Sequence, residues 1–142
     1  MKKTGSLLIA FVLILSVLLS GCQDKESTDN ILNFENVELE SDLVELAYGN
    51  FTINRDGDLV IGAQVEYRLR NLMESDQFLN STAEFYDTSD ILLYTAPTKA
   101  IDLKSKGSPG DEDATEHEAT YSGENASQVS YVKIIVEERY LT

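Results

Sequence analysis

Leu59 to Leu69 reads LVIGAQVEYRL, and this stretch decides the fold class. Its apolar side chains recur at every second position from Leu59 through Ile61 to Leu69, and mostly polar residues stand between them. A two-residue period is that of a β-strand with one buried and one exposed face, whereas a helix would scatter these residues around its axis. We therefore expect a central strand here, with Leu59 and Ile61 buried along with the rest of the apolar face.

Shorter alternating segments flank this stretch on both sides. They lie at 31–48, 51–53, 78–86, 91–95, 101–103, 111–121 and 129–136, and polar or glycine-containing turns separate them. The first segment breaks near Ser41-Asp42, which predicts two short strands or one bent strand. Asp56-Gly57 predicts a hairpin, because both positions of such a turn favour positive φ. The pattern is typical of an all-β fold, a single antiparallel immunoglobulin-like sandwich of about seven to nine strands.

The first residues have the features of a secretory signal. Lys2 and Lys3 precede an apolar run of 13 residues, Leu7 to Leu19, which only Ser16 interrupts. As a helix at ~1.5 Å per residue, this run would span roughly 20 Å, less than the ~30 Å hydrocarbon core of a membrane. The run therefore indicates a signal peptide rather than a permanent membrane helix.

The residues that follow the run, Leu19-Ser20-Gly21-Cys22, resemble the lipobox of prokaryotic lipoproteins. The resemblance implies cleavage between Gly21 and Cys22 and a diacylglycerol on the cysteine sulfur, so the protein would be held at the cell membrane, facing its extracytoplasmic side. The chain then divides into a signal peptide at 1–21, a lipidated flexible tether at 22–30 and a β-sandwich at 31–142. An uncleaved signal anchor, or ordinary cleavage that leaves a free thiol, is the alternative. Cys22 is the only cysteine, so no intramolecular disulfide can form.

Charge makes nucleic acid the least expected partner. Two of the 11 Lys and Arg residues lie in the signal, so the chain from Cys22 onward has nine basic residues against 25 acidic ones, a formal net charge of −16. Such an excess repels phosphate groups, although salt confines the effect to ~8 Å. We expect contact with the membrane only through the lipid on Cys22, and a soluble, repelling surface in preference to a site for a basic partner. The identity of any envelope protein partner stays open.

Phe85-Tyr86-Asp87 ends one alternating segment and precedes an acidic turn. Together with Pro109-Gly110 before an acidic residue, it resembles the FxLYD family of prokaryotic extracytoplasmic domains, over about residues 51–138, although leucine is missing before Tyr86. The resemblance implies an immunoglobulin-like sandwich and brings no catalytic residues. In physical terms, we expect Phe85 to fill the core and Asp87 to accept backbone hydrogen bonds in its turn.

Few residues are candidates for catalysis or for metal binding. His117 is the only histidine, its neighbours Glu116 and Glu118 would point to the opposite face of a strand, and no serine sits in a nucleophile-elbow pattern. We therefore expect a structural histidine, no catalytic residue and no cofactor. Asp111 and Asp113 are weak candidates for a divalent cation, since carboxylates suit calcium, but solvated acidic loops are more common.

The sequence thus predicts a non-enzymatic, lipid-anchored interaction or structural module of the cell envelope. The alternative is an extracytoplasmic lipoprotein that binds a small ligand or a divalent cation through its acidic loop. A hydrolase would have to use His117.

Overall fold

The computed structural model describes residues 34–142, so the predicted signal peptide, the cleavage site at Gly21 and Cys22 and the tether at 22–30 lie outside the described part. Within residues 34–142 the elements are β1 (Val37–Glu40), β2 (Val44–Asp56), β3 (Leu59–Asn71), β4 (Gln77–Tyr86), β5 (Leu92–Thr95), β6 (Lys99–Leu103), β7 (His117–Tyr121), the 3₁₀ turn η2 (Ala126–Gln128) and β8 (Tyr131–Glu138). This part of the chain contains no helix with the length and hydropathy needed to cross a membrane.

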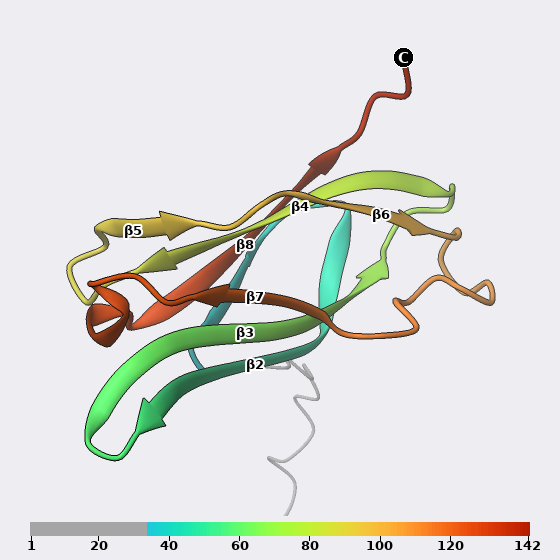
Figure 1. The fold of residues 1–142 in the computed structure, drawn as a ribbon. Helices are drawn as coiled ribbons and strands as arrows, with labels where there is room; N and C mark the ends of the chain where they lie inside the picture. Colours follow the sequence, from blue (N-terminus) through green and yellow to red (C-terminus); the bar gives the residue numbers. More distant parts are fainter. Residues whose placement is uncertain (1–33) are drawn as a thin grey trace, which may run out of the picture. The chain divides into compact units, whose positions relative to one another are not determined.

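The strands form two sheets, which lie as two layers in Figure 1. One sheet has the order β1-β8-β4, with β5 and β6 following one another along the remaining edge of β4. The other has the order β2-β3-β7, so the strand that contains LVIGAQVEYRL is central, as the sequence predicts. The all-β sandwich is therefore confirmed, with eight strands in the described residues.

One strand pair departs from the expected antiparallel arrangement. Val37 of β1 pairs with Val132 of β8 and Leu39 pairs with Ile134, so these two strands run parallel. The other strand pairs within residues 34–142 are antiparallel. β1 and β8 lie near opposite ends of the described chain, and no tight hairpin connects them to force an antiparallel pairing.

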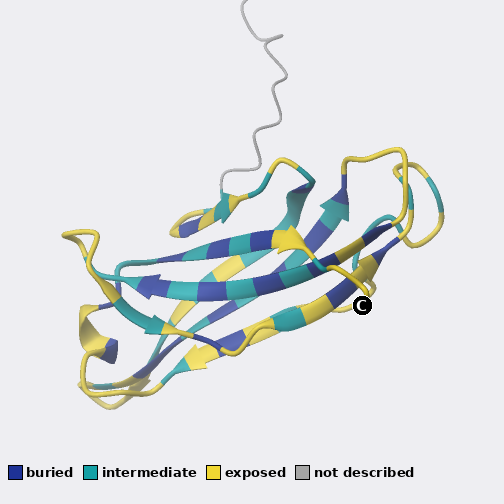
Figure 2. Ribbon diagram, turned by 90° about the horizontal axis from the view of Figure 1, so that it is seen from above, coloured by how far each residue is buried: buried dark blue, intermediate teal, exposed yellow. Residues whose placement is uncertain are grey.

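The core lies between the two layers, where side chains of alternating parity meet. Figure 2 shows the resulting bands of buried and less buried residues along the strands. Tyr67 of β3 and Phe85 of β4 are the largest fully buried side chains. The Tyr67 hydroxyl and Oγ of Ser81 are 2.8 Å apart, and this hydrogen bond joins the two sheets across the core. Burial raises the pKa of the Tyr67 phenol, so it stays neutral, with a hydrogen-bond partner.

A β-bulge near the start of β2 changes the faces on which its residues lie. Leu46 pairs with Leu69 and Tyr48 pairs with Arg68, so Ala47 is an extra residue in the ladder. The bulge reverses the alternation, so Tyr48 lies on the outer face and not on the face that it would share with Val44 and Leu46 in a regular strand. Its ring instead lies 5.6 Å from the Arg68 guanidinium carbon. The segments around 44–48 and 51–53, predicted as separate strands, are therefore one strand.

The prediction that Leu59 and Ile61 are buried is wrong. Their exposed fractions are 68% and 49%. β7 ends at Tyr121, which pairs with Ala63, so β3 continues beyond its neighbour and only β2 accompanies it there. In addition, Ile61 is an extra residue in the β2–β3 ladder. This extra residue reverses the alternation, so Leu59, which pairs with Asp56, lies on the outer face of the sheet rather than on the core face.

Candidate functional site

His117 packs at one end of the core, beside Asp113 and Tyr67. It begins β7, where its buried Nε2 lies 3.0 Å from Oδ1 of Asp113 but forms no hydrogen bond. Its ring centroid is 5.4 Å from that of Tyr67. The carboxylate of Asp113 is 8% exposed, and its second oxygen accepts a hydrogen bond from the backbone N–H of Leu69 at 2.8 Å. Histidine and aspartate therefore close the end of the core together.

The two weak metal candidates have internal partners. Asp113 is held by Leu69, whose backbone carbonyl also accepts a hydrogen bond from the Asp113 N–H at 2.9 Å. Oδ2 of Asp111 accepts a hydrogen bond from the Gly107 N–H at 2.8 Å. Residues 34–142 contain no group of three or more potential metal ligands close enough to hold an ion. A cation here would therefore have to displace hydrogen bonds that shape the loop.

The acidic residue between them, Glu112, binds arginine. Its carboxylate accepts hydrogen bonds from Arg70 at 2.6 and 3.2 Å and lies 3.4 Å from the Arg68 guanidinium. Arg70 also reaches Glu45 at 3.0 Å, and the hydrogen bonds to Glu112 and Glu45 raise the pKa of its guanidinium. The network joins β2, β3 and the loop before β7 on the outer side of the sheet. The sequence held no signal for it, because its members are 25 and 42 positions apart.

Phe85 and Asp87 have structural positions. Phe85 is fully buried, within about 6 Å of the rings of Tyr94 and Tyr121, at centroid distances of 5.9 and 6.1 Å. Oδ1 of Asp87 accepts hydrogen bonds from the N–H groups of Ser89 and Ile91, at 2.8 and 2.9 Å. The aspartate therefore closes the turn between β4 and β5.

Tyr86, between them, faces outward and forms part of an aromatic pair. Its ring stacks on Tyr131 of β8 at a centroid distance of 5.2 Å and an interplanar angle of 8°. Its hydroxyl donates a 2.5 Å hydrogen bond to Glu84, which is the main cause that raises the pKa of Tyr86 to about 12. The Lys133 ammonium lies 5.4 Å from the same ring. This pair marks one end of the outer face of the β1-β8-β4 sheet.

Pro109 and Gly110 form a tight turn. The N–H of Asp111 donates to the carbonyl of Ser108 at 3.0 Å, and Gly110 has a φ of 91°. Proline followed by a residue of positive φ is the arrangement of a type II turn. The carbonyl of Gly110 also accepts a hydrogen bond from the N–H of Lys104 at 2.9 Å, which ties the loop to the end of β6.

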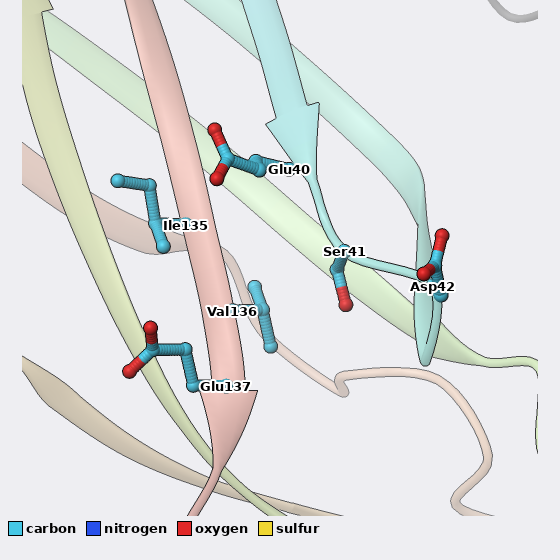
Figure 3. Close-up of a pocket in the computed structure, with 6 residues that line it drawn as sticks. All are labelled: Glu40, Ser41, Asp42, Ile135, Val136 and Glu137. Carbon is cyan, nitrogen blue, oxygen red and sulfur yellow. The ribbon is translucent and has the colours of Figure 1, made fainter.

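The outer face of the five-stranded sheet has two shallow hollows, one on each side of Ile135. One, of about 310 Å³, includes Glu40, Asp42 and Glu137 in its lining, and the other, of about 260 Å³, includes Glu137 and Glu84. Figure 3 shows that the three carboxylates of the first hollow spread around it and do not converge on one point. The face is thus acidic and open, without the geometry of an ion site.

The second open surface is the end of the β2–β3 hairpin, which continues past the end of β7 in Figure 1. Leu59 and Ile61 are exposed there, and Phe51 and Ile53 of β2, which pair with Val65 and Ala63, are half-buried. The hairpin closes at Gly57-Asp58, and only Gly57 of these two has positive φ, as in a type II′ turn. Asp56 belongs to the strand, so the turn lies one residue later than Asp56-Gly57 predicts. We call residues 50–61 the open hairpin.

Comparisons with known proteins give little further information. No protein-family model matches the chain, and no curated protein matches it in sequence. The fold has a likeness to the crystal structure of Campylobacter jejuni cj0090, with a TM-score of 0.44 and 12% identity, over 74% of this chain and 99% of that chain. A likeness of this size carries no argument about function, and the FxLYD resemblance stays a prediction.

Proposed function

We propose that this protein is a lipid-anchored, non-enzymatic interaction module on the extracytoplasmic side of the cell membrane. The observation that carries the proposal is the order of its N-terminal residues: basic residues, a short apolar run, and Leu19-Ser20-Gly21-Cys22. A diacylglycerol on Cys22 would supply two acyl chains, whereas a single acyl chain holds a protein to a membrane only marginally. The immunoglobulin-like character implied by the FxLYD resemblance belongs to the same proposal.

The open hairpin supports the interaction role. Leu59 and Ile61 lie on the parity that is buried elsewhere along β3, yet they are exposed. Apolar side chains gathered on one exposed surface are typical of interaction sites. The use of His117 and Asp113 in a packing contact supports the non-enzymatic part, because these residues would otherwise be the first candidates for acid–base chemistry.

Metabolic labelling with palmitate and cell fractionation would test the anchor. In a Cys22→Ser variant the precursor can remain uncleaved and stay in the membrane through its apolar run. We therefore add Leu19→Ala, which creates the small-residue pattern Ala-Ser-Gly of an ordinary signal cleavage site. The wild-type chain should carry label and sediment with membranes, and Leu19→Ala/Cys22→Ser should be unlabelled and soluble.

Leu19→Ala alone is the matched control. It keeps Cys22, so it should still incorporate palmitate. An unlabelled wild-type chain, or label that persists without Cys22, would contradict the anchoring proposal. The control separates a general failure of export from a specific loss of the lipid.

A further inference from the structure

We infer that two copies of this chain pair through the outer edge of β2, antiparallel and centred on Thr52. Within residues 34–142, β2 hydrogen-bonds as a strand to β3 alone; Phe34 packs against Tyr48 and Gly49, and from Asn50 onward the other edge is open. This inference names the partner of the proposed interaction module and rests on that proposal for its biological meaning. It does not depend on the lipid.

The β2 edge differs from the other sheet edges in length and protection. β1, β5, β6 and β7 have only four or five residues, whereas β2 has 13. On β7, the backbone carbonyl of Glu118 accepts a hydrogen bond from the Lys99 ammonium, which occupies that edge with a charge. β2 contains neither lysine nor proline. Proteins normally block long edges with such residues, so an unblocked edge of this length is suited to pairing with another strand.

The charge distribution favours a second copy over a basic partner. The ten residues from Leu46 to Arg55, LAYGNFTINR, contain no carboxylate, although the chain has 25. A basic partner would be attracted to the acidic faces elsewhere, and little would draw it to this neutral stretch. A like-charged second copy can approach closely only where carboxylates are absent, and β2 provides such a stretch.

Pairing about Thr52 also brings compatible side chains together. Thr52 would face Thr52 of the second copy, Asn50 would face Asn54, and Phe51 would face Ile53. Thr–Thr pairs and aromatic–β-branched pairs stabilise antiparallel strands by about 0.2–1 kcal/mol each. Arg55 would lie opposite Gly49, so no like charges meet. The half-buried Phe51 and Ile53 of both copies would then form one apolar strip across the new strand pair.

Disulfide trapping in intact cells would test this arrangement. Directly opposite residues have Cβ atoms about 4.5–5.5 Å apart, close enough for a disulfide after a small shift. Thr52→Cys in the full chain, treated with a thiol oxidant, should give a band of twice the chain mass on a non-reducing gel. Thr120→Cys is the matched control, since Thr120 is also an exposed threonine on an edge strand of the same sheet. It should stay at the mass of one chain.

Two further arms complete the experiment. Thr52→Lys should move the purified lipidated protein in detergent from two chain masses to one in sedimentation, while Thr120→Lys should not. Equal crosslinking of Thr52→Cys and Thr120→Cys, or capture by Thr52→Cys of a protein of another mass, would overturn the inference. Repeating the trap in the Leu19→Ala/Cys22→Ser background removes any contribution of Cys22. A dimer there would stand even if the anchoring proposal failed.

Discussion

At the scale of single residues, Asp113 shows how an acidic side chain that looks available in the sequence is used in the fold. Its carboxylate accepts the Leu69 N–H and lies beside His117, in an environment that is almost closed to solvent. Asp113→Ala leaves the Leu69 N–H without this acceptor. A loss of about 1–3 kcal/mol in the free energy of unfolding is expected for a buried group left unpaired.

Urea unfolding of the variants would check this prediction. Asp113→Asn keeps an acceptor oxygen and should recover part of the loss. Glu116→Ala is the control, because its carboxylate is 51% exposed and lies 3.8 Å from Arg68, and it should change stability by less than about 0.5 kcal/mol. A stable Asp113→Ala protein would show that the carboxylate is not needed to close this end of the core.

The raised pKa of Tyr86 predicts that the folded protein loses stability at alkaline pH. Its hydrogen bond to Glu84 raises the pKa in the folded state to about 12, above the ordinary value of 10.0. The folded state therefore favours the neutral phenol, and its stabilisation is complete below pH 10 and is lost as the pH rises toward 12. Tyr86→Phe should reduce the fall in stability between pH 10 and 12 relative to wild type. Thermal unfolding at several pH values would measure it, and an unchanged slope would contradict it.

At the scale of elements, the Pro109-Gly110 turn provides the next prediction. Gly110 has a φ of 91°, and a Cβ added there would lie 3.2 Å from Cγ of Lys104. Gly110→Ala should therefore destabilise the protein by about 1–3 kcal/mol through backbone strain and crowding. Gly107→Ala separates the two causes, since Gly107 also has positive φ but open space around it. Denaturant midpoints should rank wild type above Gly107→Ala and Gly107→Ala above Gly110→Ala.

The strands also show which features of the fold the alternation in the sequence could predict and which it could not. Alternation predicted the central strand and the buried face of β4 that ends at Phe85, because each of these strands has a neighbour on either side and one face against the opposite sheet. It could not predict the face of Tyr48, because a single extra residue at Ala47 reverses the parity without leaving a sequence signal. It also could not predict that Leu59 is exposed, because a second extra residue at Ile61 reverses the parity again and β7 ends before this point.

At the scale of the whole molecule, the acidic hollows and the open edge of β2 both arise from the topology. The hollows beside Ile135 exist because β1, β8 and β4 lie side by side, although β1 and β8 are about ninety positions apart in the chain. The open edge exists because β2 comes to lie outside β3 in its sheet. Neither neighbourhood follows from local periodicity, which fixes the face of a residue but not the order of strands.

The net charge predicts that salt stabilises the folded protein. The chain has 25 carboxylate residues and 11 basic residues, and several of the latter, including Arg68, Arg70, Lys104 and Arg139, already lie in ion pairs. The remaining carboxylates repel one another more in the compact state than in the unfolded chain, and salt screens this repulsion. Sodium chloride raised from 20 to 500 mM, about a fivefold shorter screening length, should raise the unfolding free energy by on the order of 1 kcal/mol, or roughly 4–8 °C in Tm.

A variant with fewer acidic groups distinguishes screening from other effects of salt. Asp42 and Glu137 line the same hollow, and within residues 34–142 neither belongs to an ion pair. Asp42→Asn/Glu137→Gln should therefore be more stable than wild type at low salt and should gain less from added chloride, because part of the repulsion has gone. If both proteins gained equally, salt would act through burial of apolar surface and not through charge. Repulsion on the acidic outer face would then not lower the unfolding free energy measurably. Its charge would affect only the approach of other molecules.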